Sequence, residues 1–259
     1  MGRISLIVVL AVFVSIFSGT FAPDSLADGG ERPEWMPEIT ADVMFETKYI
    51  WRGQNLGNDP VIQIGTGASL VGLSFAMWGN YDTGPLDRFT EWDYLFDYTF
   101  NVGEATEWFG MGDKNSAILD LLSASVGYTY YTFPNLPDDK KGTNESHEPY
   151  ASLSYDVLFQ PFLTVYMDVD TGGGTYWEYG VSHAFELSED IEAGLGITGG
   201  YNAGQWGFDW SFSNLLFSGE VGIPIFEYFT ISPNVNYSLP LDDQYDAEFY
   251  GGVNINATY

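Results

Sequence analysis

The sequence of 259 residues contains no cysteine, so neither disulfide bonds nor cysteine-ligated metal sites can hold the protein together. Basic residues are scarce as well: eight Lys and Arg stand against 36 Asp and Glu, which gives a formal net charge of -28. A surface this acidic repels nucleic acid, so no nucleic-acid partner is expected. The same surface can concentrate cations, or it can simply keep exposed loops soluble.

Long apolar runs are also missing, with one exception near the start. Residues Leu6–Phe17 are largely apolar and follow the basic Arg3, which is the pattern of a secretory signal peptide. We expect this signal peptide to comprise residues 1–27, although cleavage after Thr20 or Ala22 is also compatible with the sequence. The run is too short for a membrane-spanning helix, which needs about 20 residues.

Later apolar runs are interrupted by Gly, Asp or Asn, and the mean hydropathy is -0.06, which argues against a helical membrane protein. Residues 28–38 are rich in Gly and Pro and are expected to form a linker. Residues 39–259 alternate apolar and polar side chains almost throughout, which predicts β-strands. In residues 91–102, for example, aromatic residues such as Trp92 and Phe96 share one face, and acidic residues share the other.

Twelve alternating segments can be counted. They cover residues 43–52, 62–70, 73–80, 91–102, 119–133, 150–157, 162–170, 175–187, 191–201, 210–223, 228–239 and 247–259. Removing residues 1–27 from 259 leaves 232, or about 19 per strand and connection, which fits membrane-spanning strands of about 10 residues. Ten or fourteen strands are also compatible. The stretch Gly103–Ser116 falls where a short turn is expected, and it indicates either longer strands or an insertion.

The last seven residues, Val253–Tyr259, alternate without interruption and end on an aromatic side chain. Bacterial outer-membrane barrels have strands of this kind, with aromatic residues at the membrane interface. We expect the apolar residues of this strand to face lipid and the polar ones to line the lumen beside the first strand. The barrel-assembly machinery is the expected partner of this strand, through its terminal Tyr259.

Alternation alone is also compatible with a soluble sandwich whose apolar face points inward, such as a secreted lectin-like protein. Two features favour the membrane. Aromatic residues make up 17% of the chain and lie near strand ends, as interface girdles require. The opposite face is rich in Gly, Ser, Thr, Asn and acids, which is typical of a wet lumen. The sequence therefore predicts an all-β fold: a transmembrane antiparallel up-and-down β-barrel of about twelve strands, surrounded by outer-membrane lipid.

Charged side chains on the polar face are the candidate pore-lining residues. They are Glu46, Lys48 and Arg52, assigned to the first strand, Glu91, Asp93 and Asp97, assigned to the strand over 91–102, and Asp168 and Glu178. Opposite charges inside a narrow barrel commonly pair, because a buried unpaired charge is costly. Charged rings can also form a constriction that selects ions through the local potential. Both interpretations stay open at this point.

Motifs for catalysis and metal binding are weak. Some outer-membrane barrels are lipases, but His147, in the predicted loop Pro134–Glu148, and His183, on the lipid-facing phase, have no nucleophile in a recognisable setting. Residues Asp168–Gly172 begin like a calcium-binding loop, yet Tyr179 stands where the bidentate Glu is required. We therefore expect no enzymatic activity, no cofactor and no specific metal site, although acidic loops can bind divalent cations loosely.

Several short aromatic-rich motifs resemble the TorF family of porin-like proteins. They are Lys48–Asn55, Asp59–Pro60 with the following Gln63–Gly65, Glu91–Tyr94, Gly127–Tyr131 and Glu148–Tyr155. The resemblance covers roughly residues 41–186. It implies a bacterial outer-membrane β-barrel of poorly defined substrate, and it supplies no catalytic residues. The stretch Gly103–Ser116 and the acidity of the chain depart from the family pattern.

These observations favour a porin-like channel in the outer membrane of a bacterial cell, which passes small solutes or cations through an acidic lumen. The alternative is a barrel with a closed lumen that serves as a structural or surface-interaction protein. Inward aromatic residues such as Trp78 and Tyr131 would close the lumen in that case.

Overall fold

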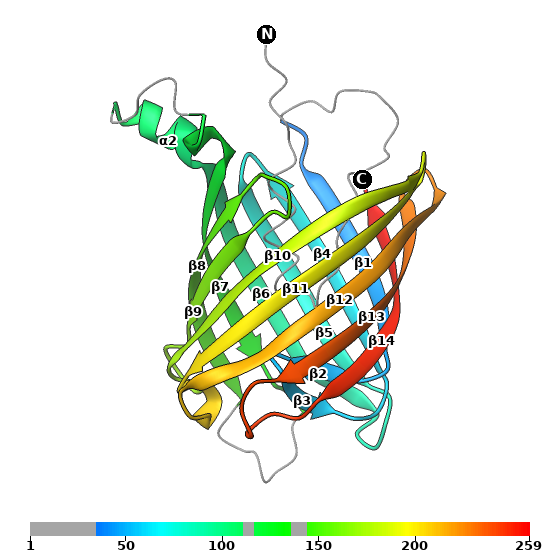
Figure 1. Cartoon of the computed structure of the whole chain (residues 1–259). Coiled ribbons are helices and arrows are strands. Elements are labelled where there is room, and N and C mark those ends of the chain that lie inside the picture. The colour runs from blue at the N-terminus through cyan, green and yellow to red at the C-terminus, as the bar shows by residue number, and fades with distance from the viewer. Residues whose placement is uncertain (1–34, 111–116, 136–143) are drawn as a thin grey trace.

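The computed structural model describes residues 35–110, 117–135 and 144–259. Twelve antiparallel strands close into one barrel, in which each strand pairs with the barrel strands before and after it and β1 also pairs with β14 (Figure 1). The predicted fold class and strand number are confirmed. The predicted signal peptide lies outside the described residues, and β1 begins at Glu38, the last residue of the predicted linker.

The barrel strands are β1 (Glu38–Glu46), β4 (Val61–Leu70), β5 (Leu73–Asp82), β6 (Arg88–Asn101), β7 (Leu122–Thr132), β8 (Glu145–Tyr155), β9 (Phe162–Met167), β10 (Thr175–Ser188), β11 (Ile191–Ala203), β12 (Ser211–Phe226), β13 (Phe229–Pro240) and β14 (Glu248–Thr258). The other elements are a hairpin of β2 (Tyr49–Trp51) and β3 (Gln54–Gly57), the helix α2 (Val102–Trp108), and the 3₁₀ turns η2 (Leu119–Leu121) and η4 (Gln205–Gly207). No helix within the described ranges is long and apolar enough to cross a membrane.

The two faces of the barrel wall differ in chemistry. In β6, Phe96 and Tyr98 are 55% and 45% exposed on the outside, while Asp97 between them is buried on the inside. Large apolar side chains are exposed in the same way on the other barrel strands. A soluble sandwich has the opposite arrangement, with its apolar face inward. The outer face suits hydrocarbon, and a closed ladder leaves no strand edge unpaired in lipid, so the barrel belongs in a membrane.

The barrel closes between its first and last strands. Ile39 and Tyr259 exchange two backbone hydrogen bonds of 2.9 Å at this seam. In β14, Val253 and Ile255 are exposed on the outside, whereas Asn254 between them is buried. The alternation of this strand is therefore the one that its sequence predicts.

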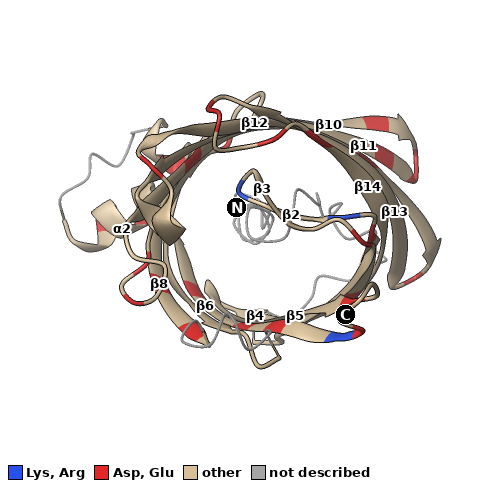
Figure 2. Ribbon diagram, turned by 90° about the horizontal axis from the view of Figure 1, so that it is seen from below, with Lys and Arg blue, Asp and Glu red and all other residues tan. Residues whose placement is uncertain are grey.

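Connections differ between the two ends of the barrel. At the end where β14 finishes, which we call the turn end, two-residue turns join β4 to β5, β10 to β11 and β12 to β13. Helix α2 also lies at this end, outside the barrel wall (Figures 1 and 2). Because β6 ends at Asn101, residues 102–108 form an insertion rather than a longer strand. The other end, the loop end, carries residues 47–60 between β1 and β4.

A glycine in the wall makes room for one inward aromatic side chain. Gly127 in β7 lies beside Tyr150 of β8 in the register, and a Cβ atom at position 127 would collide with the Tyr150 ring. The same ring donates a 2.9 Å hydrogen bond from its hydroxyl to Asp97 Oδ2. Gly127 therefore allows this contact across the inner wall.

Replacing Gly127 with Val should destabilise the barrel by about 1–3 kcal/mol, because the Tyr150 ring must leave its position. The midpoint of urea unfolding in detergent measures this change. Gly219→Val is the matched control, since the nearest neighbour there is the flexible end of Leu195, at 3.3 Å from the added Cβ. Equal midpoints for the two variants would contradict the assignment.

Candidate functional site

The most distinctive feature of the interior is the hairpin β2–β3, which folds from the loop end into the barrel (Figure 2). Its turn residues, Arg52 and Gly53, both have positive φ angles, 50° and 79°, as two-residue turns of type I′ require. Gly53 suits this conformation, and a Cβ there would also collide with Asn214 of β12. Arg52 adopts it at a steric cost, so its surroundings must hold it in place.

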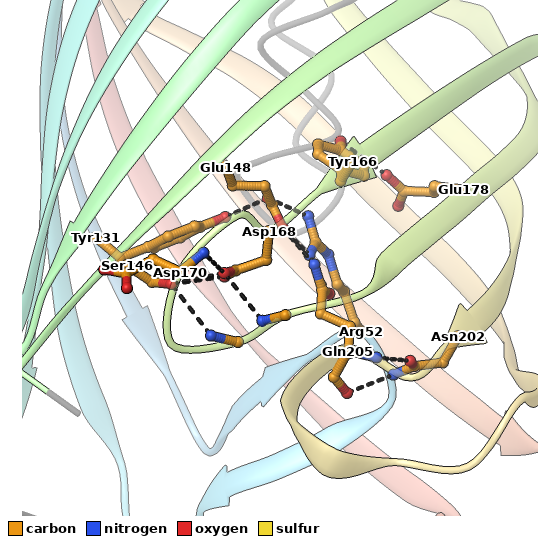
Figure 3. Close-up of polar contacts among 12 residues, drawn as sticks. Arg52, Tyr131, Ser146, Glu148, Tyr166, Asp168, Asp170, Glu178, Asn202 and Gln205 are labelled. Carbon is orange, nitrogen blue, oxygen red and sulfur yellow. Dashed lines mark hydrogen bonds and ion pairs between the residues drawn. The ribbon is translucent and has the colours of Figure 1, made fainter. Parts of the chain in front are cut away.

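Arg52 is held at the turn by a bidentate ion pair (Figure 3). Its Nη1 and Nη2 atoms donate to Oε1 and Oε2 of Glu148 in β8, at 2.7 and 2.8 Å. Nη1 also donates to Oε1 of Gln205, at 2.7 Å, and Nε2 of Gln205 donates to Glu148 Oε1 at 2.6 Å. Because both charged side chains are buried, the two hydrogen bonds of the pair fix the orientation of the turn as well as its position.

Aromatic rings surround the same guanidinium group. Its central carbon lies 4.1 Å from the ring centre of Tyr166 and 4.8 Å from that of Tyr176, and it also stacks on its neighbour Trp51, at 4.4 Å. Burial alone lowers the pKa of Arg52, but the carboxylate of Glu148 raises it well above its ordinary value. Arg52 is therefore charged at any working pH, and the rings add cation–π attraction to the ion pair.

The open end of the hairpin is bound to two other strands of the wall. Lys48 Nζ donates to Oε2 of Glu248 in β14 at 2.6 Å, and Asn55 Nδ2 donates to Oε1 of the same residue at 2.7 Å. Tyr49 donates from its hydroxyl to Glu91 Oε2 in β6 at 2.8 Å. Burial, then Glu91, raises the pKa of Tyr49, so its hydroxyl keeps the proton that it donates. The hairpin is thus bound to strands β6, β8 and β14.

Aromatic contacts add to these polar anchors. The Tyr49 ring lies 5.9 Å from that of Trp78 in β5, and the Trp51 ring lies 6.1 Å from that of Tyr131 in β7. Trp78 and Tyr131 are both buried inside the barrel. The inward aromatic residues singled out from the sequence are therefore the residues on which the hairpin packs.

Five of the acids predicted to line the pore face the interior from the wall: Glu46, Glu91, Asp93, Asp97 and Glu178. Neutral side chains donate hydrogen bonds to four of them, whereas Asp93 Oδ1 accepts none from the described residues. Glu46 accepts from Asn234 at 2.9 Å, and Glu178 accepts from the Tyr166 hydroxyl at 3.2 Å. None of the five forms an ion pair with a basic side chain of the described ranges.

Asp168 has a different role, because it organises the loop between β9 and β10. Its two carboxylate oxygens accept from Ser146 Oγ at 2.8 and 2.7 Å. Its Oδ1 also accepts from the backbone N–H groups of Asp170 and Gly173, at 3.0 and 3.1 Å. These hydrogen bonds fix the loop that carries the calcium-loop-like spacing.

Three predictions about position are wrong. The sequence places Lys48 and Arg52 on the first strand, but β1 ends at Glu46 and both residues lie in residues 47–60, the hairpin segment, which carries β2 and β3. The alternation continues through Tyr49 and Trp51 because β2 is also a strand, yet these rings pack inside the barrel. His147 was assigned to a loop, but β8 begins at Glu145 and includes it.

Residues that the sequence did not single out complete the site: Glu148, Gln205, Glu248, Tyr166 and Tyr176. Glu148 and Glu248 stand at the alternate positions that face the lumen, so the alternation of the sequence could have identified them as interior residues. Gln205 lies in η4, and nothing in its local sequence points to the interior.

Basic side chains are few within the described ranges. Lys48 and Arg52 lie inside the barrel, and each is paired with a carboxylate. Arg88 is exposed at the start of β6. Figure 2 shows the acidic residues in red along the barrel strands and the few basic residues in blue.

No family model and no curated protein matches the sequence. Among solved structures, the NanC porin superposes with a TM-score of 0.51 at 9% sequence identity, over 85% of this chain and 98% of the porin. An outer membrane channel from Pseudomonas putida F1 superposes with a TM-score of 0.50 at 8% identity, over 93% of this chain and 100% of the channel. This chain therefore has the fold of outer-membrane barrels, in agreement with the predicted outer-membrane location. The resemblance to the TorF family stays a prediction.

Proposed function

We propose that the barrel is a porin-like channel of the outer membrane that admits small cations and cationic solutes past the hairpin β2–β3. The observation that carries this proposal is the position of the hairpin, which lies in the interior and is bound to three separate strands of the wall. An ordered element inside a barrel narrows the passage and sets which side chains a solute meets.

The charges around the hairpin favour the passage of cations over that of anions. Both basic side chains of the hairpin segment are neutralised by carboxylates, whereas Glu91, Asp93 and Asp97 have no basic partner in the described part of the chain. Among the described residues, Asp93 Oδ1 and Glu46 Oε2 accept no hydrogen bond although they are buried. Such oxygens are satisfied by water or by a cation, and their field attracts cations into the barrel.

Reversal potentials in a KCl gradient across a planar bilayer test the selectivity. The native protein is expected to favour K⁺ over Cl⁻, and Glu91→Gln combined with Asp93→Asn should lower the permeability ratio by about twofold or more. Glu227→Gln, in the exposed turn between β12 and β13, removes a charge far from the hairpin and should leave the ratio unchanged. Preference for anions would contradict the proposal.

A closed structural barrel is the second candidate, and one observation favours it. Glu148 and Gln205 are completely buried, so side chains pack tightly around the turn of the hairpin. A protein of this kind inserts into bilayers without producing current steps. Conductance therefore separates the two candidates.

A further inference from the structure

A second group of polar side chains lies on the outer face of the barrel at the loop end, apart from the hairpin. Glu145 and His147 are two residues apart in β8, so both point to the same face of the strand. Asp170, from the loop between β9 and β10, completes the group. One ligand atom from each residue lies within 4.8 Å of those from the other two, and His147 Nε2 is 4.0 Å from Asp170 Oδ2.

Two tyrosines of β7 hold the strand residues in place. The Tyr128 hydroxyl is hydrogen-bonded to His147 Nδ1, which leaves Nε2 as the ring nitrogen facing Asp170. The Tyr130 ring stacks on the imidazole, with centres 4.9 Å apart and planes at 15°. Its hydroxyl donates to Glu145 Oε2 at 2.5 Å, while Oε1 of that carboxylate accepts no hydrogen bond from the described residues.

The loop that carries Asp170 is tied to the same strand. Val169 donates its backbone N–H to the His147 carbonyl oxygen at 2.9 Å. The Asp170 N–H donates to Asp168 Oδ1 at 3.0 Å, and Asp168 is fixed by Ser146. The backbone therefore brings Asp170 beside His147 independently of any attraction between the two side chains.

We propose that Glu145, His147 and Asp170 bind a divalent transition-metal ion such as Zn²⁺. An imidazole nitrogen with two carboxylate oxygens is a donor set that these ions favour, and Tyr128 acts as the outer partner that orients the ligating ring. Ligands of one tetrahedral Zn²⁺ lie about 3.3 Å apart, given bond lengths of about 2.0–2.2 Å, so closing the site needs only small side-chain movements. Three protein ligands leave a coordination position for water.

The imidazole separates this group from the other acidic surfaces of the chain. Ca²⁺ and Mg²⁺ prefer oxygen ligands and gain little from a nitrogen donor. The site is therefore expected to discriminate against both ions, which carboxylates alone would not do. The sequence does not reveal this site, because Asp170 lies in the loop between β9 and β10, whereas Glu145 and His147 lie in β8.

Calorimetric titration of the full-length protein in detergent with ZnCl₂ tests the proposal. We expect one saturable site that persists in millimolar Ca²⁺ or Mg²⁺. His147→Ala and Asp170→Asn should each weaken Zn²⁺ binding by at least about tenfold. His183→Ala is the matched control, because His183 is the other histidine of the chain. It lies on β10, and its ring packs against those of Phe159 and Phe185. This variant should bind Zn²⁺ like the native protein.

A spectrum of the native protein avoids any effect of the substitutions on folding. With ¹⁵N-labelled histidine the chain has two imidazole groups, and Zn²⁺ should shift the resonances of one of them, assigned to His147 by its loss in His147→Ala. Zn²⁺ that leaves both imidazoles unshifted, or that binds His147→Ala as tightly as the native protein, would overturn the proposal. Equal displacement of Zn²⁺ by Ca²⁺ would also overturn it.

Discussion

Replacing the hairpin segment, residues 47–60, by a two-residue Asn-Gly turn is expected to raise the single-channel conductance several-fold. The barrel tolerates this deletion because Glu46 and Val61, on either side of the segment, are directly paired in the register of β1 and β4. A two-residue turn of this type matches the twist of antiparallel neighbours. The deletion removes the hairpin with all its interior side chains, while every strand of the wall remains.

Recording single channels of the native and deleted proteins in the same lipid measures the effect. Circular dichroism and the shift of the folded band on unheated gels verify that the deleted protein keeps its barrel. Equal conductance of two folded proteins would show that the hairpin does not limit the passage.

Glu148→Ala is expected to release the turn of the hairpin from the wall. The substitution leaves the buried guanidinium of Arg52 without its carboxylate, and removing one partner of a buried ion pair costs about 3–5 kcal/mol. Tyr166 and Tyr176 still contact Arg52, but neutral rings do not replace a carboxylate. The cost falls on docking of the hairpin, because Arg52 is the charged partner of Glu148, whereas its other donors, Gln205 and the Tyr131 hydroxyl, are neutral.

Trypsin cleavage after Arg52 reports this release directly. The Arg52 side chain is 8% exposed in the folded protein, so cleavage requires the hairpin to leave the wall. We expect Glu148→Ala to increase the cleavage rate by on the order of a hundredfold or more. Glu227→Ala, in an exposed turn, is the control and should cleave at the native rate. A protected Arg52 in Glu148→Ala would contradict the role of the ion pair.

The wall of the barrel could be predicted because lipid and lumen impose opposite chemistry on alternate residues. In β6, the run from Trp92 to Phe100 shows this pattern without interruption, and the structure has β6 over Arg88–Asn101. The predicted ends of strands are less accurate where the polarity of the side chains does not differ between the two faces. Residues 145–148 have charged and polar side chains on both faces, so the sequence predicts a loop where the structure begins β8.

The hairpin could not be recognised from alternation, because a strand inside the barrel alternates like a strand of the wall. Tyr49 and Trp51 fall on the same side of the alternation as Val43 and Phe45, which face outward. The local sequence does not show that the two rings pack on Trp78 and Tyr131 instead of facing lipid. The Arg-Gly turn also lacks the Asn or Asp that usually marks a type I′ turn.

The partners of the hairpin lie far away in the sequence. Arg52 and Glu148 are 96 residues apart, and Lys48 and Glu248 are 200 residues apart. Contacts at this separation follow from how the closed barrel brings β8 and β14 around one interior. A single sequence indicates which side chains face inward, but not which of them meet.

A cysteine in the hairpin can test whether β2–β3 lies in the path of the permeating ion. The chain has no cysteine, and Leu56 is 49% exposed, so Leu56→Cys provides a single reactive thiol. Attaching a bulky cationic methanethiosulfonate reagent during a bilayer recording should lower the cation current in one step per channel. Complete labelling of the thiol with no change in current would contradict this position of β2–β3.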